Sequence, residues 1–185
     1  AAAPVGMQVQ FPGFFSAGTI EDLVSPARDE AKKSREKQLK QLKELLASAR
    51  AYRLSRAAGA GGGAVPDADP ALEAMLPVIE GRVPVLVTAH DVRQIRAAVQ
   101  WAKDESLKIA ILGGEEAPDV AELLRSNDVP VILGPILNLP QHRDDPYDAA
   151  YTVAARLHAA GVRYCISGGG SGFSASNARN LPFQA

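Results

Sequence analysis

Polar residues directly follow two short apolar runs in the second half of this chain, and they carry its best candidate chemistry. His90 follows the run Pro84–Ala89, and Glu115 lies just beyond the run Lys108–Leu112. Histidine exchanges protons near neutral pH, and a carboxylate at the end of a strand can act as a base or a ligand. A structural hydrogen bond for His90, and the attraction of a helix dipole for Glu115, are the alternative explanations. Asp91 is a candidate helix cap.

Further candidates lie in the later loops of the chain. Asn138, His142 and Asn177 are polar residues in such loops, and with His90 and Glu115 they form our candidate set for substrate binding. None of the spacings identifies a nucleophile or a general base, because the serines lack a GxSxG frame and no histidine lies near the single cysteine in sequence. The catalytic residues therefore stay unassigned.

A glycine-rich segment, Ser167–Gly172, follows the apolar run Val162–Ile166. Glycines after a strand allow backbone amides to approach an anion, so Gly168, Gly169 and Gly170 are candidate anion-binding residues. The segment matches neither GxGxxG nor the GK[ST] of a P-loop, and a sharp strand-to-helix turn without a ligand explains it equally well. A phosphate-binding β/α enzyme is therefore one alternative function.

Composition excludes several other classes. The formal net charge of −1 gives no electrostatic basis for binding nucleic acid, and one cysteine among 185 residues rules out an intrachain disulfide and a cysteine-based metal site. The three histidines fit neither HxH nor HExxH, so we expect no metal site made by this chain alone. No apolar stretch approaches the length of a membrane span, so we expect a soluble chain whose compartment the sequence leaves open.

The arrangement of apolar runs predicts parallel β/α units in the second half. The runs are separated by helical patterns long enough for the crossovers that parallel strands require. At 185 residues the chain is shorter than the roughly 250 residues of a closed (β/α)₈ barrel. The expected strands are Pro84–Ala89, Lys108–Leu112, Pro130–Leu133 and Val162–Ile166, and the expected helices are Val92–Lys103, Pro118–Ser126 and Tyr151–Ala160.

The first third has a different pattern. Residues 6–11 alternate and predict one more strand, and Pro26–Arg56 predicts a long basic amphipathic helix, whereas the Gly- and Ala-rich run Ala57–Pro66 should not hold a helix. Asp69 and Pro70 are an N-cap and first-turn pair that should open a second helix. We therefore divide the chain into residues 1–66 and a β/α region over 67–185. We expect a buried stripe on the first helix, formed by Leu39, Leu42, Leu46 and Ala49. On the second helix we expect Leu72, Leu76 and Ile79 to lie on one side.

The chain from about Met7 to Ala185 resembles the C-terminal half of the barrel in imidazolonepropionase-like members of the amidohydrolase superfamily. The likeness is most specific at DDPYD (144–148), LHAAGV (157–162) and SNARNLP (176–182). It implies an α/β fold of parallel β/α units, the C-terminal half of a TIM-type (β/α)₈ barrel. It also implies metal-dependent hydrolysis of C–N bonds in amides or cyclic amides, commonly with zinc.

The resemblance places metal ligands at positions where this chain has other residues. Thr88 stands where the family has a histidine on the fifth strand, Gly113 where it has one on the sixth, and Gly168–Gly170 where it has an aspartate after the eighth. Zinc needs about three protein ligands, so we predict no cofactor for this chain. The alternative to a hydrolase is a metal-free structural or binding subunit of a larger assembly.

Two structural expectations follow. Parallel units put the carboxyl ends of all strands on one side, so the candidate loops should line a single cleft. About five strands cannot close a barrel, so we expect an oligomer, or a remaining part of the same precursor, to complete it against the edges near Gln8–Phe11 and Tyr164–Ile166.

Overall fold

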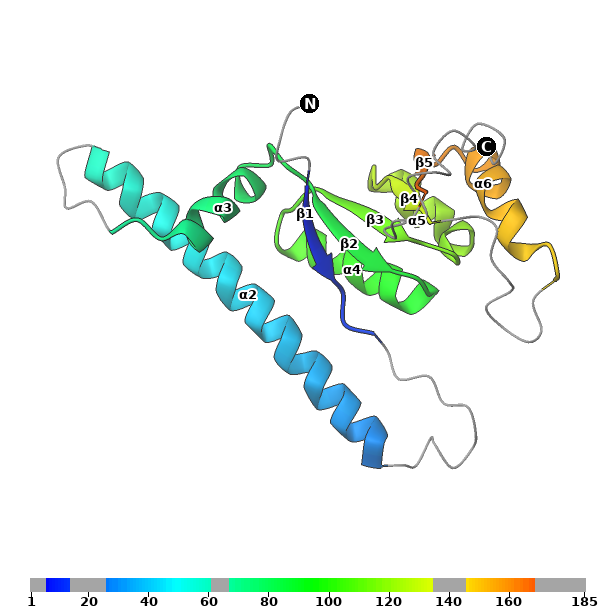
Figure 1. The fold of residues 1–185 in the computed structure, drawn as a ribbon, viewed down its shortest axis with the longest axis horizontal. Helices are drawn as coiled ribbons and strands as arrows, with labels where there is room; N and C mark the ends of the chain where they lie inside the picture. The colour runs from blue at the N-terminus through cyan, green and yellow to red at the C-terminus, as the bar shows by residue number, and fades with distance from the viewer. Residues whose placement is uncertain (1–5, 14–25, 61–66, 135–145, 169–185) are drawn as a thin grey trace. The chain divides into compact units, whose positions relative to one another are not determined.

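The computed structural model describes residues 6–13, 26–60, 67–134 and 146–168 (Figure 1). The chain divides into two compact units. One, the helical unit, contains the helices α2 (Pro26–Ala60) and α3 (Pro70–Ile79). The other, the sheet unit, contains a five-stranded sheet from Gln8 onward and the helices between its strands. No helix in the described ranges is long and apolar enough to cross a membrane.

The sheet is parallel, and its strands lie side by side in chain order. Hydrogen bonds from Met7 N–H to Pro84 O (3.1 Å) and from Phe11 N–H to Thr88 O (3.2 Å) join its first two strands. The order contains no reversal, which is how consecutive strands are arranged in part of a β/α barrel. The strands are β1 (Met7–Gln10), β2 (Val85–Ala89), β3 (Ile109–Gly113), β4 (Val131–Leu133) and β5 (Tyr164–Ile166).

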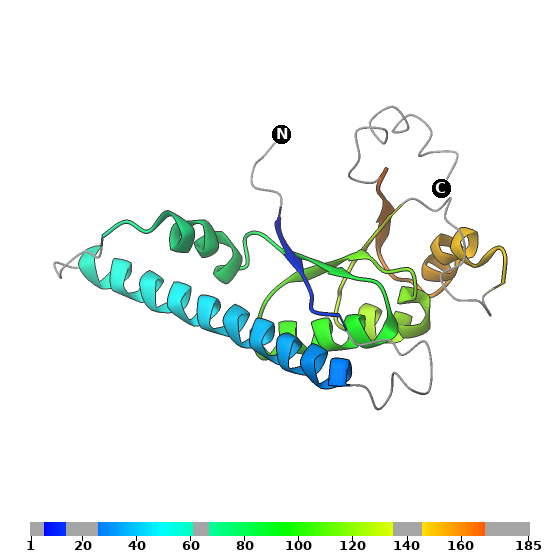
Figure 2. The same ribbon diagram turned by 60° about the horizontal axis from the view of Figure 1, so that its bottom comes forward.

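Helices between the strands cover one face of this sheet. Figure 2 shows α4 and α5 along the same side of it. The elements are α4 (Val92–Asp104), the 3₁₀ turn η1 (Ala117–Val120), α5 (Ala121–Ser126) and α6 (Ala149–Ala159). Ile95 and Val99 of α4 are buried, and the centroid of the Trp101 ring lies 6.0 Å from that of Phe11. The helix expected over Pro118–Ser126 begins as the tighter turn η1, with Pro118 in its first turn, where no amide hydrogen is needed.

The two faces of the sheet differ in burial. Along β2, Val85, Val87 and Ala89 are fully buried, whereas Leu86 and Thr88 on the opposite face are partly exposed. Because neighbouring strands keep this alternation in register, the second face also carries Leu112 and Ile132, which are partly exposed, and Cys165, which is exposed. In a closed barrel this face would be the interior.

The helical unit packs α3 against α2 around a small apolar core. Its buried side chains are Leu46, Ala49 and Tyr52 of α2 and Met75 and Val78 of α3. The expected stripe on α2 is therefore buried at Leu46 and Ala49, while Leu39 and Leu42 are partly exposed. On α3, Leu72, Leu76 and Ile79 are partly buried, and the residues that face the core are Met75 and Val78, which the sequence analysis did not single out.

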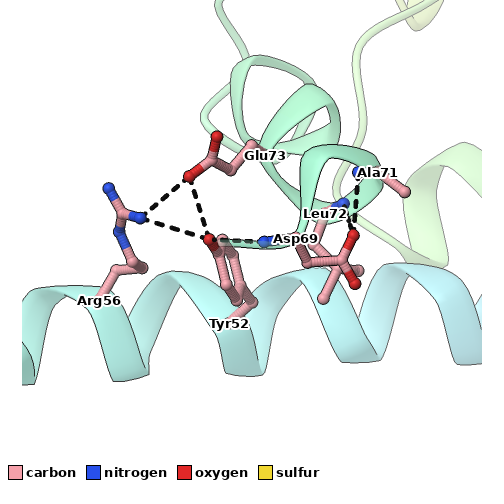
Figure 3. Close-up of polar contacts among 6 residues, drawn as sticks. All are labelled: Tyr52, Arg56, Asp69, Ala71, Leu72 and Glu73. Atoms are coloured by element: carbon pink, nitrogen blue, oxygen red, sulfur yellow. Dashed lines mark hydrogen bonds and ion pairs between the residues drawn. The ribbon is translucent and has the colours of Figure 1, made fainter. Parts of the chain in front are cut away.

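Polar groups join the two helices at the start of α3 (Figure 3). The hydroxyl of Tyr52 donates to Glu73 Oε1 at 3.1 Å and accepts from the backbone N–H of Asp69 at 3.4 Å. Arg56 donates to the same carboxylate oxygen at 2.9 Å. Asp69 caps α3 as predicted, since its Oδ1 accepts from the N–H groups of Ala71 and Leu72 at 2.9 and 3.3 Å.

The end of α2 corrects one expectation. The helix continues through Ala60, so the prediction that the run from Ala57 cannot be helical is wrong for its first four residues. Alanine is the best helix former, and the one glycine in this stretch, Gly59, costs about 1 kcal/mol relative to alanine. Continuation of a long helix by residue-by-residue propagation offsets that cost, because its nucleus has already formed.

Candidate functional site

His90 and Glu115 meet at the carboxyl ends of two neighbouring strands. His90 directly follows β2, and Glu115 follows β3 after one intervening glycine, Gly114. Because β2 and β3 are paired in parallel, with Ala89 opposite Gly113, the residues after them emerge at the same edge. His90 Nδ1 lies 2.7 Å from Glu115 Oε2. The structure therefore brings together these two members of the candidate set.

The backbones of the two strand-end loops are joined by hydrogen bonds. Gly114 N–H donates to Ala89 O at 2.9 Å, and Glu116 N–H donates to His90 O at 3.2 Å. The carboxylate of Glu116 reaches back and accepts from Val92 N–H at 2.8 Å. Glu115 and Glu116, adjacent in sequence, thus have separate roles: the first contacts an imidazole, and the second satisfies an amide at the start of α4.

The first turn of α4 also holds the backbone of His90. Asp91 caps this helix as predicted, because its Oδ1 accepts from Arg93 N–H at 2.8 Å and from Gln94 N–H at 2.9 Å. Gln94 Oε1 accepts from His90 N–H at 3.0 Å. The main-chain amide and carbonyl of His90 are therefore both bonded, one to the helix side and one to the β3 loop.

The contact between His90 and Glu115 shifts the pKa of each group toward an ion pair. The hydrogen bond to Glu115 raises the pKa of His90, with the negative charges of Glu115 and Asp91 adding to it and burial opposing it. Burial acts to raise the pKa of Glu115, but it is outweighed by the hydrogen bond to His90, a backbone hydrogen bond and the imidazolium charge, so this pKa is lowered. The charged forms favour one another.

The carboxylate of Glu115 fixes the orientation of the His90 imidazole. The contact at Nδ1 leaves Nε2 for another partner, and no described residue supplies one. The side chain of His90 is 54% exposed and that of Glu115 is 28% exposed, so a ligand can reach the imidazole while the carboxylate lies beneath it. An oriented, accessible imidazole with a carboxylate behind it is a group that can accept or donate a proton.

The described residues do not fit a zinc site. In residues 6–13, 26–60, 67–134 and 146–168, no group of three or more His, Cys, Asp or Glu is placed to hold a metal ion. His90 Nδ1 and Glu115 Oε2 contact each other, so these two atoms are not open to a metal ion. Thr88, at the end of β2 on the second face, has a buried hydroxyl oxygen that meets no hydrogen-bond partner, and a neutral hydroxyl is not among the usual zinc ligands.

The remaining candidates fall mostly outside the described residues. Asn138, His142 and Asn177 lie there, as do Gly169 and Gly170. His90 and Glu115 lie at the same edge of the sheet, and the single cleft stays a prediction. Gly168 is described and follows β5. Just before it, Ser167 N–H donates to Leu133 O at 2.8 Å, which continues the pairing of β5 with β4.

The sequence did not predict the roles of three residues that shape this site. Gln94 and Glu116 hold the two loops, and Gly113 at the end of β3 lies against the His90 ring. Glu116 was visible as a strand-end carboxylate, but nothing in the sequence says which of two adjacent glutamates turns toward the histidine. The role of Gly113 depends on its backbone angle, which no sequence pattern records.

Comparison with known proteins gives one informative likeness. No protein-family model matches the chain, and no curated protein matches it. A crystal structure of an amidohydrolase from Thermotoga maritima MSB8 superposes on 90% of the chain with a TM-score of 0.67 and 18% sequence identity. The two proteins share a fold. This chain spans 42% of the length of that amidohydrolase, so the fold they share is part of a larger one.

Proposed function

We propose that this chain is an amidohydrolase-like protein, imidazolonepropionase-like in its sequence features, that acts on the C–N bond of an amide or cyclic amide. The observation that carries the proposal is the His90–Glu115 pair at the carboxyl edge of a barrel-type sheet. Active sites of β/α barrel enzymes lie at this edge. The shared fold with an amidohydrolase supports the same assignment.

In this proposal His90 handles the proton. Its Nε2 accepts a proton from the attacking water as the oxygen bonds to the carbonyl carbon, and it gives that proton to the leaving nitrogen as the C–N bond breaks. Glu115 holds the imidazole in orientation through Nδ1 and stabilises its charged form. Asn138, His142 and Asn177 complete substrate binding from the neighbouring loops, and Gly168–Gly170 offer backbone amides to a negative group.

We further propose that another polypeptide segment completes the barrel. It is either the remainder of the same precursor or a partner subunit, and it adds strands beside β1 and β5. The support is the second face of the sheet, where Leu86, Leu112 and Ile132 are partly exposed instead of packed in a core. For the isolated chain, light scattering and urea unfolding should show either an assembly larger than one chain or a monomer that does not unfold cooperatively. A cooperatively folding monomer would contradict the proposal.

A metal-free binding subunit is the second candidate. It is favoured by Thr88 and Gly113, which stand where the family resemblance places metal-binding histidines. A subunit of this kind would bind an amide-containing ligand at the same strand ends without turning it over.

A hydrolysis assay separates these two functions. The purified chain, in whatever assembly it forms, is incubated with a lactam, a cyclic imide and an N-acyl amide, and products are detected by the mass gain of one water. We expect turnover, and a loss of about 10²-fold or more in His90→Gln, the usual range for a general acid–base group. His158→Gln is the matched control, since His158 is exposed on α6. Binding without turnover would favour the subunit.

A further inference from the structure

Gly113 occupies a position that no other residue type could fill without moving His90. Its φ is +102°, a backbone conformation that residues with a Cβ rarely adopt. A Cβ added there would lie 2.7 Å from Nδ1 and 2.8 Å from Cε1 of the His90 ring, and 3.3 Å from the carbonyl oxygen of Ala89. The first two separations are well inside van der Waals contact, so the imidazole lies in the space of the missing side chain.

The backbone of His90 cannot retreat to relieve such a clash. Its N–H is bonded to Gln94 and its carbonyl to the N–H of Glu116, at 3.0 and 3.2 Å. Rotation of the imidazole away from position 113 is the response that keeps both of these hydrogen bonds. Because Glu115 contacts Nδ1, the ring atom nearest to that position, the rotation would break the 2.7 Å contact.

We propose that Gly113 is the positioning residue that allows His90 and Glu115 to pair, so that this pair and a side chain at position 113 exclude each other. The family resemblance places a histidine at this position. The absence of a side chain at Gly113 therefore leaves space for the His90 ring, and this allows the ring to contact Glu115. The inference rests on the proposed use of His90, but its first test needs no turnover.

The test is an NMR titration of the histidine rings in the intact chain. There are three histidines, and His90→Gln assigns the signal of His90. We expect His90 to titrate above its ordinary value of about 6.5 and to return toward that value in Glu115→Gln and in Gly113→Ala. Gly134→Ala is the matched control: Gly134 also follows a strand, and a Cβ there meets nothing within 4 Å. It should leave the His90 titration unchanged. An unchanged titration in folded Gly113→Ala would overturn the proposal.

A second measurement keeps the proposal testable if Gly113→Ala folds poorly. Part of its cost comes from the positive φ and part from the clash with the imidazole. The clash alone disappears in the His90→Ala background, so Gly113→Ala should lower the urea midpoint less there than in the wild-type chain. Equal losses in the two backgrounds would show that the ring is not displaced, and the proposal would fail.

The outcomes also separate this inference from the proposed function. If Gly113→Ala abolishes the raised titration of His90 but the wild-type chain hydrolyses nothing, the positioning role stands and the hydrolase assignment falls. If hydrolysis occurs and His90 titrates identically with glycine or alanine at 113, the hydrolase assignment stands and the positioning role falls.

Discussion

The helical unit and the sheet unit each hold a carboxylate against a basic side chain, but the two pairs differ in chemistry. In the helical unit Glu73 accepts from Arg56 at 2.9 Å, and in the sheet unit Glu115 contacts His90 at 2.7 Å. A guanidinium stays charged at every pH a protein meets, whereas an imidazole titrates close to neutrality. The charge of the basic partner is constant in the first pair, whereas in the second it depends on whether the imidazole is protonated.

The two units also differ in the size of the apolar core that lies behind each pair. The largest fully buried side chains of the described residues, including Ile95, Ile111, Leu124 and Leu157, all lie in the sheet unit. The helical unit has a smaller core and adds polar contacts among Tyr52, Glu73 and the capping residue Asp69. A well-packed sheet can carry a polar pair at its edge that its core does not need, whereas a pair of helices with a small core depends more on its polar contacts for stability.

The largest expected effect is on the core of the sheet unit. Leu157 in α6 is fully buried, so Leu157→Ala should lower the free energy of unfolding by about 2–5 kcal/mol through lost burial and the cavity left behind. Leu54→Ala is the control, because Leu54 on α2 is 65% exposed and its truncation should change stability by less than about 0.5 kcal/mol. Urea denaturation measures both. Equal effects would mean that the contrast in packing is false.

Removal of the α3 cap tests the polar contacts of the helical unit. Asp69→Ala leaves the N–H groups of Ala71 and Leu72 without their acceptor, which should cost about 1 kcal/mol. Asp67→Ala, two residues earlier and exposed, is the control and should cost nothing measurable. Helix content by circular dichroism during urea unfolding follows the loss. A neutral Asp69→Ala would show that packing alone holds α3.

The hydroxyl of Tyr52 should contribute slightly less. Tyr52→Phe keeps the buried ring but removes the oxygen shared by Glu73, Arg56 and the Asp69 amide, a loss of about 0.5–1.5 kcal/mol for groups that water can partly re-solvate. Tyr151→Phe is the matched control, since Tyr151 is 52% exposed. If both substitutions shift the urea midpoint equally, the hydroxyl is not part of the helix contact.

The smallest effect, and the sharpest contrast between the two pairs, is pH dependence. A raised His90 pKa stabilises the fold below about pH 6.5 and loses that contribution as pH rises through the folded value. A lowered Glu115 pKa stabilises above about pH 4.3 and loses its contribution as pH falls through the folded value. The stability lost in Glu115→Gln should therefore be greatest between these limits.

That loss should stay below about 1 kcal/mol, because the pair is partly exposed and solvent screens it. Urea titrations of wild type and Glu115→Gln from acid to mildly alkaline pH measure it. For Glu73→Gln the loss should not decline as pH rises through neutrality, because its arginine partner stays charged. If the stability losses in Glu115→Gln and Glu73→Gln declined over the same pH range, the two ion pairs would not differ in their pH dependence.

Much of the fold was predictable from local pattern. Short apolar runs separated by helical patterns marked β2 to β5, and Asp69 with Pro70 marked the start of α3. The buried side of α3 was not predictable, because Met75 and Val78 are chosen by the direction from which α2 packs. Tertiary packing decides among several apolar positions that sequence spacing treats alike.

The candidate site was predictable only in part. The meeting of His90 and Glu115 followed from parallel strands that end at one edge, which is a consequence of topology. Three other features depend on backbone torsions within a few residues. They are the pairing of Glu115 with the imidazole, the turn of Glu116 toward α4 and the positive φ of Gly113. Those torsions are set by how two loops fit together, and neither loop specifies them alone.

The consecutive order of the strands has a kinetic consequence. From β2 onward, each strand pairs with the one synthesised just before it, so the sheet can grow one β/α unit at a time as the chain emerges. Each of these connections is shorter than the one between β1 and β2. β1 is the exception, because two helices separate it from β2 and closing that longer connection costs more entropy. Its docking should be the slow step of folding, after β2 to β5 have already assembled.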